Sequence, residues 1–211
     1  MTNTDSRILP RFSPRLILAL PLAGLMLMIP KLALAHVCLH VGLHDGPHDG
    51  HGFAAGIGHP VGGADHVLAM VAVGIWAALG GGRAVWAMPA AFLAAMLFGG
   101  VLGAEGVPLP GVEPLILASI IALGAAAGLA WRPPLMLALV GIAICAVAHG
   151  YAHGAEGSAE LPFAAGFLIA TAALHLVGLA AGYALIKAGQ SMAARAAGGG
   201  VAMAGLVLAF A

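Results

Sequence analysis

Histidine and aspartate gather where the chain passes from a polar segment into an apolar one. The stretch "HPVGGADH" places His59, Asp65 and His66 directly before an apolar run. Imidazole with carboxylate suits the borderline divalent ions Ni²⁺, Co²⁺, Zn²⁺ and Cu²⁺, whereas Mg²⁺ and Ca²⁺ prefer shells made of oxygen. These three residues therefore predict a site for a divalent transition-metal ion. A purely structural hydrogen-bond network is the alternative.

A second group of histidines lies in "HGYAHGAE". His149 and His153 stand one helical turn apart, and Glu156 lies close on the same side if the helix continues. Gly150 and Gly154 weaken that helix. Loop histidines at the membrane interface are therefore the alternative to a second set of metal ligands.

His175 stands alone in an apolar run. It follows Pro162 by 13 residues, which places it ~20 Å deep at ~1.5 Å per helical residue. It is a candidate ligand below the two groups, and the alternative is a buried histidine that bonds a backbone carbonyl or Thr171. Cys145 is interpreted as a small apolar packing residue.

The segment 36–52 is rich in histidine. Its histidines are His36, His40, His44, His48 and His51. They repeat every three or four residues, but the glycines and the proline among them oppose a helix, so the segment is predicted to be a disordered, low-affinity metal collector. Cys38 could add a soft ligand between His36 and His40, or be a free surface thiol.

The composition of the chain is that of a membrane protein. Hydrophobic residues make up 62% of the sequence and charged residues 8%, with a mean hydropathy of +1.04, whereas about a quarter of the residues of soluble domains are charged. A net charge of zero gives no attraction to nucleic acid. Two cysteines make no disulfide framework, and the sequence lacks a G-x-x-x-x-G-K-[ST] loop for ATP.

Residues 1–35 are predicted to be a cleaved signal peptide. Basic residues at Arg7, Arg11 and Arg15 precede an apolar run, and "ALA" at positions 33–35 has the form of a cleavage site. An uncleaved signal anchor is the alternative, because a proline and a lysine interrupt the region before that site.

The rest of the chain is predicted to be all-α, a polytopic integral membrane protein with six transmembrane helices, each near the ~20 residues that cross ~30 Å of hydrocarbon. The predicted spans are 65–79, 84–103, 114–130, 133–148, 161–187 and 192–210. The basic residues assigned to the connections after spans one, three and five are Arg83, Arg132, Lys187 and Arg195, whereas Glu105, Glu113, Glu156 and Glu160 fall in the others. By the positive-inside rule, both mature termini lie outside.

The first span is predicted to be broken. Pro60, Gly62 and Gly63 disfavour a continuous helix, so residues 52–58 are expected to form a half-helix that turns His59 toward Asp65 and the residue after it. Span one begins outside and span four ends outside. Both histidine groups therefore lie at one membrane level and could form one site.

Three stretches carry a resemblance to a known family. "HPVGGADHVLAMVAVGIWAA", "AHGYAHGAE" and "LIATAALHLVGLAAG" resemble the HupE/UreJ family of bacterial nickel permeases, and the likeness extends over essentially the whole mature chain. The resemblance implies a cleaved signal peptide, a six-helix permease domain over residues 53–211 and an N-terminus on the periplasmic side of the inner membrane. It implies no enzyme and no prosthetic group. The cargo is nickel, in some members cobalt, which supplies metalloenzymes such as NiFe hydrogenase or urease.

The family motifs carry over residue by residue. The matching positions are His59, Asp65, His66, His149, His153, Glu156 and His175. The long histidine-rich tail departs from the family pattern and affects only the capture step. The expected mechanism is stepwise ligand exchange, in which the tail, His36 and His40 included, concentrates the ion, the two groups strip its water, and His175 receives it. An intramembrane metalloenzyme with Glu156 as its acid or base, and a membrane protein that binds metal without transport, are the alternatives.

Overall fold

The computed structural model describes residues 52–155 and 160–210. Within these ranges all regular structure is α-helical. The helices are α4 (Phe53–Gly62), α5 (Ala64–Gly80), α6 (Ala84–Ala104), α7 (Val112–Gly128), α8 (Leu135–Ala155), α9 (Leu161–Lys187) and α10 (Ser191–Phe210). The signal peptide, the histidine tail up to position 51 and Glu156 lie outside the described residues.

The long helices follow the predicted spans closely. Among the described residues, α6, α8, α9 and α10 are each long and apolar enough to cross a membrane, and α4 with α5 passes the same test as a bent pair. The helix α7 is apolar but has 17 residues. The chain is thus a multi-pass membrane protein, and its described part has four such helices, or five with the bent pair. Arg195 lies inside α10 rather than in a connection.

The break in the first span is confirmed, but it lies later than predicted. Pro60 stays inside α4, and the chain bends by 83° between α4 and α5. Gly63 joins them with extended backbone (φ −97°, ψ 117°). Proline removes one helical hydrogen bond without ending the helix, so α4 continues to Gly62 and is capped by Gly63.

The fourth span runs further than predicted. The helix was expected to end at position 148, yet α8 continues to Ala155 and carries both of its histidines. Gly150 and Gly154 explain the difference, because a Cβ at either position would overlap the backbone carbonyl oxygen of Met96 or Gly100 on α6. These glycines let two helix backbones approach closely, as small residues do in membranes.

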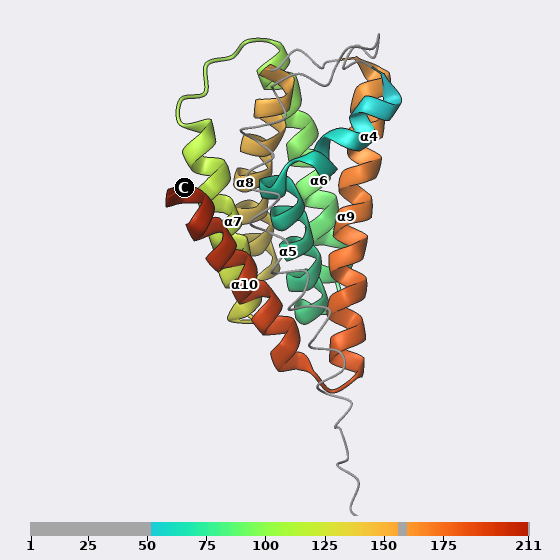
Figure 1. Ribbon diagram of the computed structural model, residues 1–211, viewed down its shortest axis with the longest axis vertical. Helices are drawn as coiled ribbons and strands as arrows, with labels where there is room; N and C mark the ends of the chain where they lie inside the picture. Colours follow the sequence, from blue (N-terminus) through green and yellow to red (C-terminus); the bar gives the residue numbers. More distant parts are fainter. Residues whose placement is uncertain (1–51, 156–159, 211) are drawn as a thin grey trace, which may run out of the picture.

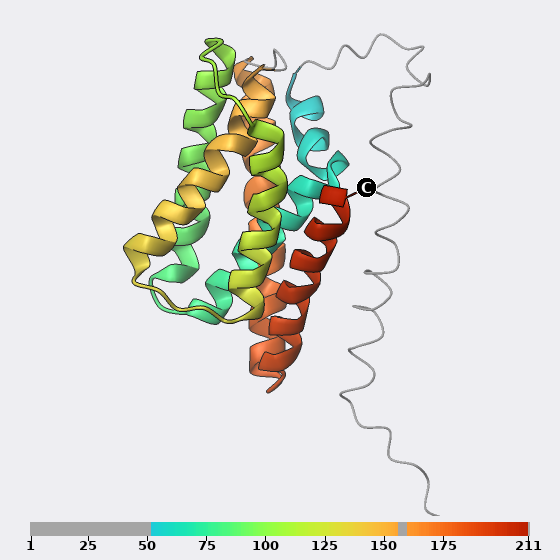
Figure 2. The ribbon, with the colours of Figure 1, turned by 90° about the vertical axis from the view of Figure 1, so that its left-hand side faces the viewer.

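The helices pack as neighbouring pairs. The most extensive contacts join α6 to α8, α7 to α10, and α5 to α9. The helix α4 lies against the N-terminal part of α9. Figure 2 shows that α6 and α8 end at the same end of the bundle where α9 begins, and that α9 and α10 meet at the opposite end. Arg83 and Arg132 directly precede α6 and α8, and Lys187 ends α9. Basic residues therefore gather at the end of the bundle where α9 and α10 meet.

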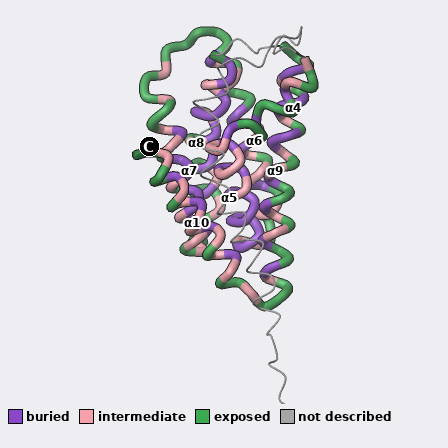
Figure 3. Tube along the Cα trace, viewed as in Figure 1, coloured by how far each residue is buried: buried purple, intermediate pink, exposed green. Residues whose placement is uncertain are grey.

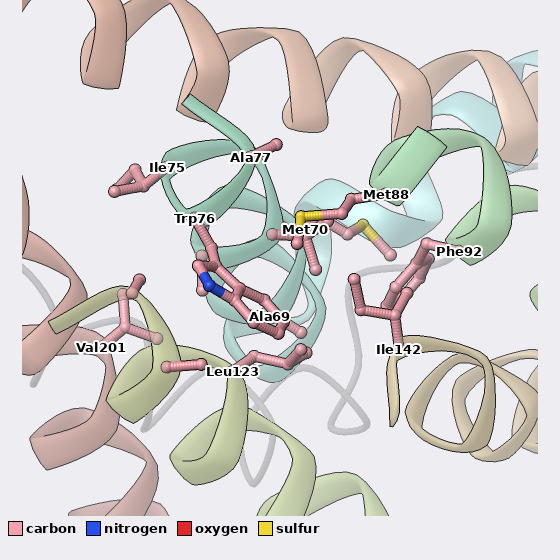
Figure 4. Close-up of a cluster of buried hydrophobic side chains, with 14 of the residues drawn as sticks. Ala69, Met70, Ile75, Trp76, Ala77, Met88, Phe92, Leu123, Ile142 and Val201 are labelled. Atoms are coloured by element: carbon pink, nitrogen blue, oxygen red, sulfur yellow. The ribbon is translucent and has the colours of Figure 1, made fainter. Parts of the chain in front are cut away.

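Each described helix except α5 has both buried and exposed positions, whereas α5 has no exposed residue. Figure 3 shows buried positions turned toward the centre of the bundle and exposed ones turned outward. The outward positions of α6, α8 and α9 include Leu97, Phe98, Met136, Leu137, Leu176 and Val177. Such large apolar side chains suit contact with lipid. At the centre, Met70, Trp76, Met88, Phe92 and Ile142 form one buried cluster (Figure 4).

Candidate metal site

Four histidine rings from three helices lie in a row. The ring of His59 on α4 is 4.6 Å from that of His153 on α8, centroid to centroid. The ring of His153 is 4.4 Å from that of His66 on α5, and His66 is 4.8 Å from His149, again on α8. The two histidine groups predicted from the sequence are therefore brought together.

Local sequence explains why these rings meet. The bend of 83° at Gly63 turns α4 away from the axis of α5 and places it against α9, and His59 and His66 both lie next to the ring of His153. The close approach of α8 to α6 through Gly150 and Gly154 holds the other two rings beside them. Without the bend at Gly63, or without the close contact between α6 and α8, the histidines of α4 and α5 would separate from those of α8.

Exposure falls along the row. His59 is exposed, His153 and His66 are 8% and 6% exposed, and His149 is fully buried. The row thus leads from the surface of the bundle into its interior.

Asp65 lies in direct contact with His66. Its Oδ1 is 3.1 Å from Nδ1 of that ring, and at this distance the negative carboxylate favours the tautomer that carries its proton on Nδ1. This leaves the lone pair of His66 on Nε2, which contacts Nε2 of His153. A carboxylate behind an imidazole is the usual way in which a protein orients a histidine ligand and strengthens its basicity.

His149 contacts a residue that sequence reasoning missed. Its Nε2 lies 2.8 Å from Oγ of Ser119 on α7, and the same hydroxyl donates to the carbonyl oxygen of Ile116 over 2.6 Å. Both side chains are buried. The signal in the sequence was a lone hydroxyl in the apolar run of α7, but nothing local ties it to a histidine 30 residues away.

His175 lies apart from the row, and its ring contacts Phe92, as the ring of His149 does. The fully buried ring of Phe92 is 5.9 Å from His149 and 5.0 Å from His175. The backbone of His175 packs on Gly74, two helical turns along α5 from His66, which corresponds to ~12 Å. The prediction that His175 lies beyond the two groups is therefore consistent with the helix geometry.

The structural alternative for His175 is wrong. Thr171 donates its hydroxyl to Sδ of Met96, 4.0 Å away, and not to His175. Neither ring nitrogen of His175 has a hydrogen-bond partner among the described residues, although the side chain is 1% exposed. A buried polar group without a partner costs ~1–3 kcal/mol and calls for a functional reason.

The donors form a row rather than a closed shell. In the described part of the chain, no three His, Cys, Asp or Glu side chains are arranged to hold one ion together. Glu156, His36 and His40 fall outside those residues. Cys145 packs against the apolar core, as expected, and takes no part in the row.

A cavity of about 190 Å³ reaches the row from the side where α9 begins. It lies between α6, α8 and α9, and His153 is part of its wall together with Gly100, Ala164 and Phe167. The other lining residues are mostly apolar. The cavity gives the second histidine of the row a route to the outside of the bundle.

The chain is similar in sequence to one known protein family. Residues 24–208 match the family model described as HupE / UreJ protein. The curated Protein HupE of Rhizobium leguminosarum bv. viciae is 45% identical over 185 residues, which cover 86% of this chain and 92% of that protein. No solved structure matches the chain.

Proposed function

We propose that this chain, which belongs to the HupE/UreJ family, moves Ni²⁺, with Co²⁺ as a second cargo, inward across the bacterial inner membrane. The ions would supply metalloenzymes such as NiFe hydrogenase or urease. The observation that carries the proposal is the row of histidine rings whose exposure falls from His59 to His149. The ion is the cargo, and the proposal assigns no prosthetic group and no catalysis.

Six spans provide the membrane frame. Besides the four long helices, the bent pair α4 and α5 supplies one span and α7 another. The 17 residues of α7 extend ~25 Å, which is at the short end of what a span needs. With basic residues gathered at the end opposite the cavity, the positive-inside rule puts the cavity on the periplasmic side.

The ion moves by ligand exchange in this mechanism. The histidine tail, with His36 and His40, raises the local concentration of metal outside. The ion then meets His59 at the surface and His153 at the wall of the cavity, and exchanges onto Nε2 of His66, whose negative partner Asp65 offsets the charge of a dehydrated cation. It continues to His149 and, past Phe92, to His175.

The donor set determines which ions fit. Imidazole nitrogens bind borderline ions in the Irving–Williams order, which places Cu²⁺ above Ni²⁺ and Ni²⁺ above Co²⁺. Preference for nickel then depends on geometry or supply. Mg²⁺, which demands oxygen ligands and retains its water, is expected to compete poorly.

The test is accumulation of radioactive nickel in proteoliposomes that contain only this protein. Transport predicts nickel inside the vesicles, protected from an external chelator, and competition by Co²⁺ but not by equal Mg²⁺. Metal that stays bound to the protein without entering the lumen would instead indicate an enzyme or a storage protein. Equal competition by Mg²⁺ would exclude an imidazole site.

A further inference from the structure

We infer that Ser119 sets the tautomer of His149 and thereby makes Nδ1 of that ring the atom that meets the ion. Ser119 is in this sense a positioning residue, since it acts through the histidine. The inference deepens the proposed function and rests on it for the identity of the ion. It brings α7 into the site, although α7 carries none of the histidines.

The hydrogen bonds of Ser119 allow only one position for its hydroxyl proton. The hydroxyl has a single proton, and the carbonyl oxygen of Ile116, 2.6 Å away, can only accept. That proton therefore points to Ile116. At the second contact, 2.8 Å long, the serine oxygen must accept, so Nε2 of His149 carries a proton and donates it.

The protonation state of the other ring nitrogen of His149 follows from this assignment. A neutral imidazole has one N–H, so Nδ1 of His149 holds the lone pair. Nδ1 is buried and has no hydrogen-bond partner among the described residues. The ring stands at 89° to the ring of His66, 4.8 Å between centroids. Because His149 is fully buried, bulk water does not offer its Nε2 a substitute partner.

Two neighbouring rings are thus fixed in opposite tautomers. The nearby carboxylate of Asp65 favours the proton on Nδ1 of His66 and leaves Nε2 to bind metal, whereas Ser119 accepts from Nε2 of His149 and leaves Nδ1. A hydroxyl strengthens the basicity of an imidazole less than a carboxylate does, so His149 is the weaker ligand of the two. A weaker second ligand suits release of the ion toward Phe92 and His175.

The experiment uses the full chain and three variants. Ser119→Ala removes the acceptor, Ser119→Thr keeps a hydroxyl that can still bond a carbonyl one turn back, and Ser191→Ala is the control at an exposed serine. Nitrogen-15 NMR of labelled histidine, assigned with a His149→Gln variant, reports the tautomer of His149. Nickel binding and uptake in proteoliposomes report the consequence.

The expected result has two parts. In the unaltered chain and in Ser119→Thr, the His149 signal is that of the Nε2–H tautomer, and in Ser119→Ala the two tautomers mix. Nickel affinity falls about 10- to 100-fold in Ser119→Ala, the range for loss of an outer-shell partner, with an unchanged amount of folded protein. A merely structural role for Ser119 would not move the tautomer.

Failure of the inference is distinguishable from failure of the proposed function. If the unaltered chain takes up nickel and Ser119→Ala keeps the tautomer or the affinity, the inference is overturned and the transport proposal stands. If the unaltered chain takes up no nickel, the transport proposal is overturned. The NMR signal of Ser119→Ala then still decides whether Ser119 sets the tautomer.

Discussion

His66 and His153 meet through their Nε2 atoms, although 87 positions separate them in the chain. One comes from the helix that follows the bend and the other from the last turn of α8. Because the carboxylate beside Nδ1 of His66 favours the proton on that nitrogen, Nε2 of His66 is the acceptor and His153 the donor in this contact. For an ion to bind between these two rings, the proton of His153 would have to move from Nε2 to Nδ1, so that both Nε2 atoms offer a lone pair.

The row predicts that its outer and inner histidines affect different kinetic constants. His153→Ala removes a ligand at the wall of the cavity, so the nickel concentration for half-maximal uptake should rise several-fold. His175→Ala leaves the outer row intact, so nickel should still bind while the maximal rate falls at least ten-fold. Both constants come from uptake into proteoliposomes over a range of nickel concentrations. A higher half-maximal concentration in His175→Ala with an unchanged maximal rate would contradict the assigned order.

Asp65→Asn tests the role of charge behind the row. The amide keeps the shape of the carboxyl group but removes the negative charge that offsets a dehydrated divalent cation. Uptake should be lost at every nickel concentration. Glu113→Gln, in the first turn of α7, is the matched loss of a carboxylate and should transport normally at equal protein levels in the membrane. Normal uptake by Asp65→Asn would remove Asp65 from the mechanism.

The histidine tail has a different predicted effect. Deletion of residues 40–51 removes ligands that only raise the local concentration of metal, so the half-maximal concentration should rise while the maximal rate survives. The measurement is the same uptake curve, normalised to protein in the membrane. Abolished uptake at saturating nickel would instead place the first obligatory binding step in the tail.

Sequence reasoning was most successful where hydropathy and breaks agree. The bounds of α9 match the predicted span, and the bend before α5 follows from Pro60, Gly62 and Gly63. The end of α8 was missed because Gly150 and Gly154 read as helix breakers. In the structure they are contact points with α6, which depends on the partner helix and not on local propensity.

The candidate site could be predicted only in part, because contacts between helices complete it. Histidine and aspartate are rare enough in apolar segments that His59, His66 and His149 could be found by type alone. Ser119 and Phe92 are ordinary residues in membrane helices, and only their positions beside His149 single them out. Those positions result from packing between helices distant in the sequence, which no spacing rule reports.

The cavity predicts that its volume is needed for uptake. Ala164 lies on the cavity wall, and Ala164→Phe should fill much of the space in front of His153. Nickel uptake should then fall at least several-fold at low concentration. Ala165→Phe is the matched control, because it adds the same ring at the exposed next position of α9. Equal uptake by the two variants would mean that ions reach the row by another route.

The close contact of α8 with α6 at Gly150 holds α8 in place. A Cβ at Gly150 would overlap the carbonyl oxygen of Met96, a backbone atom that cannot yield without moving α6, whereas a Cβ at Gly141 on the same helix meets nothing within 4 Å. Gly150→Ala should therefore cost ~1–3 kcal/mol of stability, the usual range for overpacking. It should also displace His149 from Ser119 and lower uptake. Gly141→Ala should leave the thermal midpoint in detergent and the uptake rate unchanged or slightly higher, because alanine favours helix over glycine. If the two variants unfold at the same temperature, the close contact between α6 and α8 does not set the position of the row.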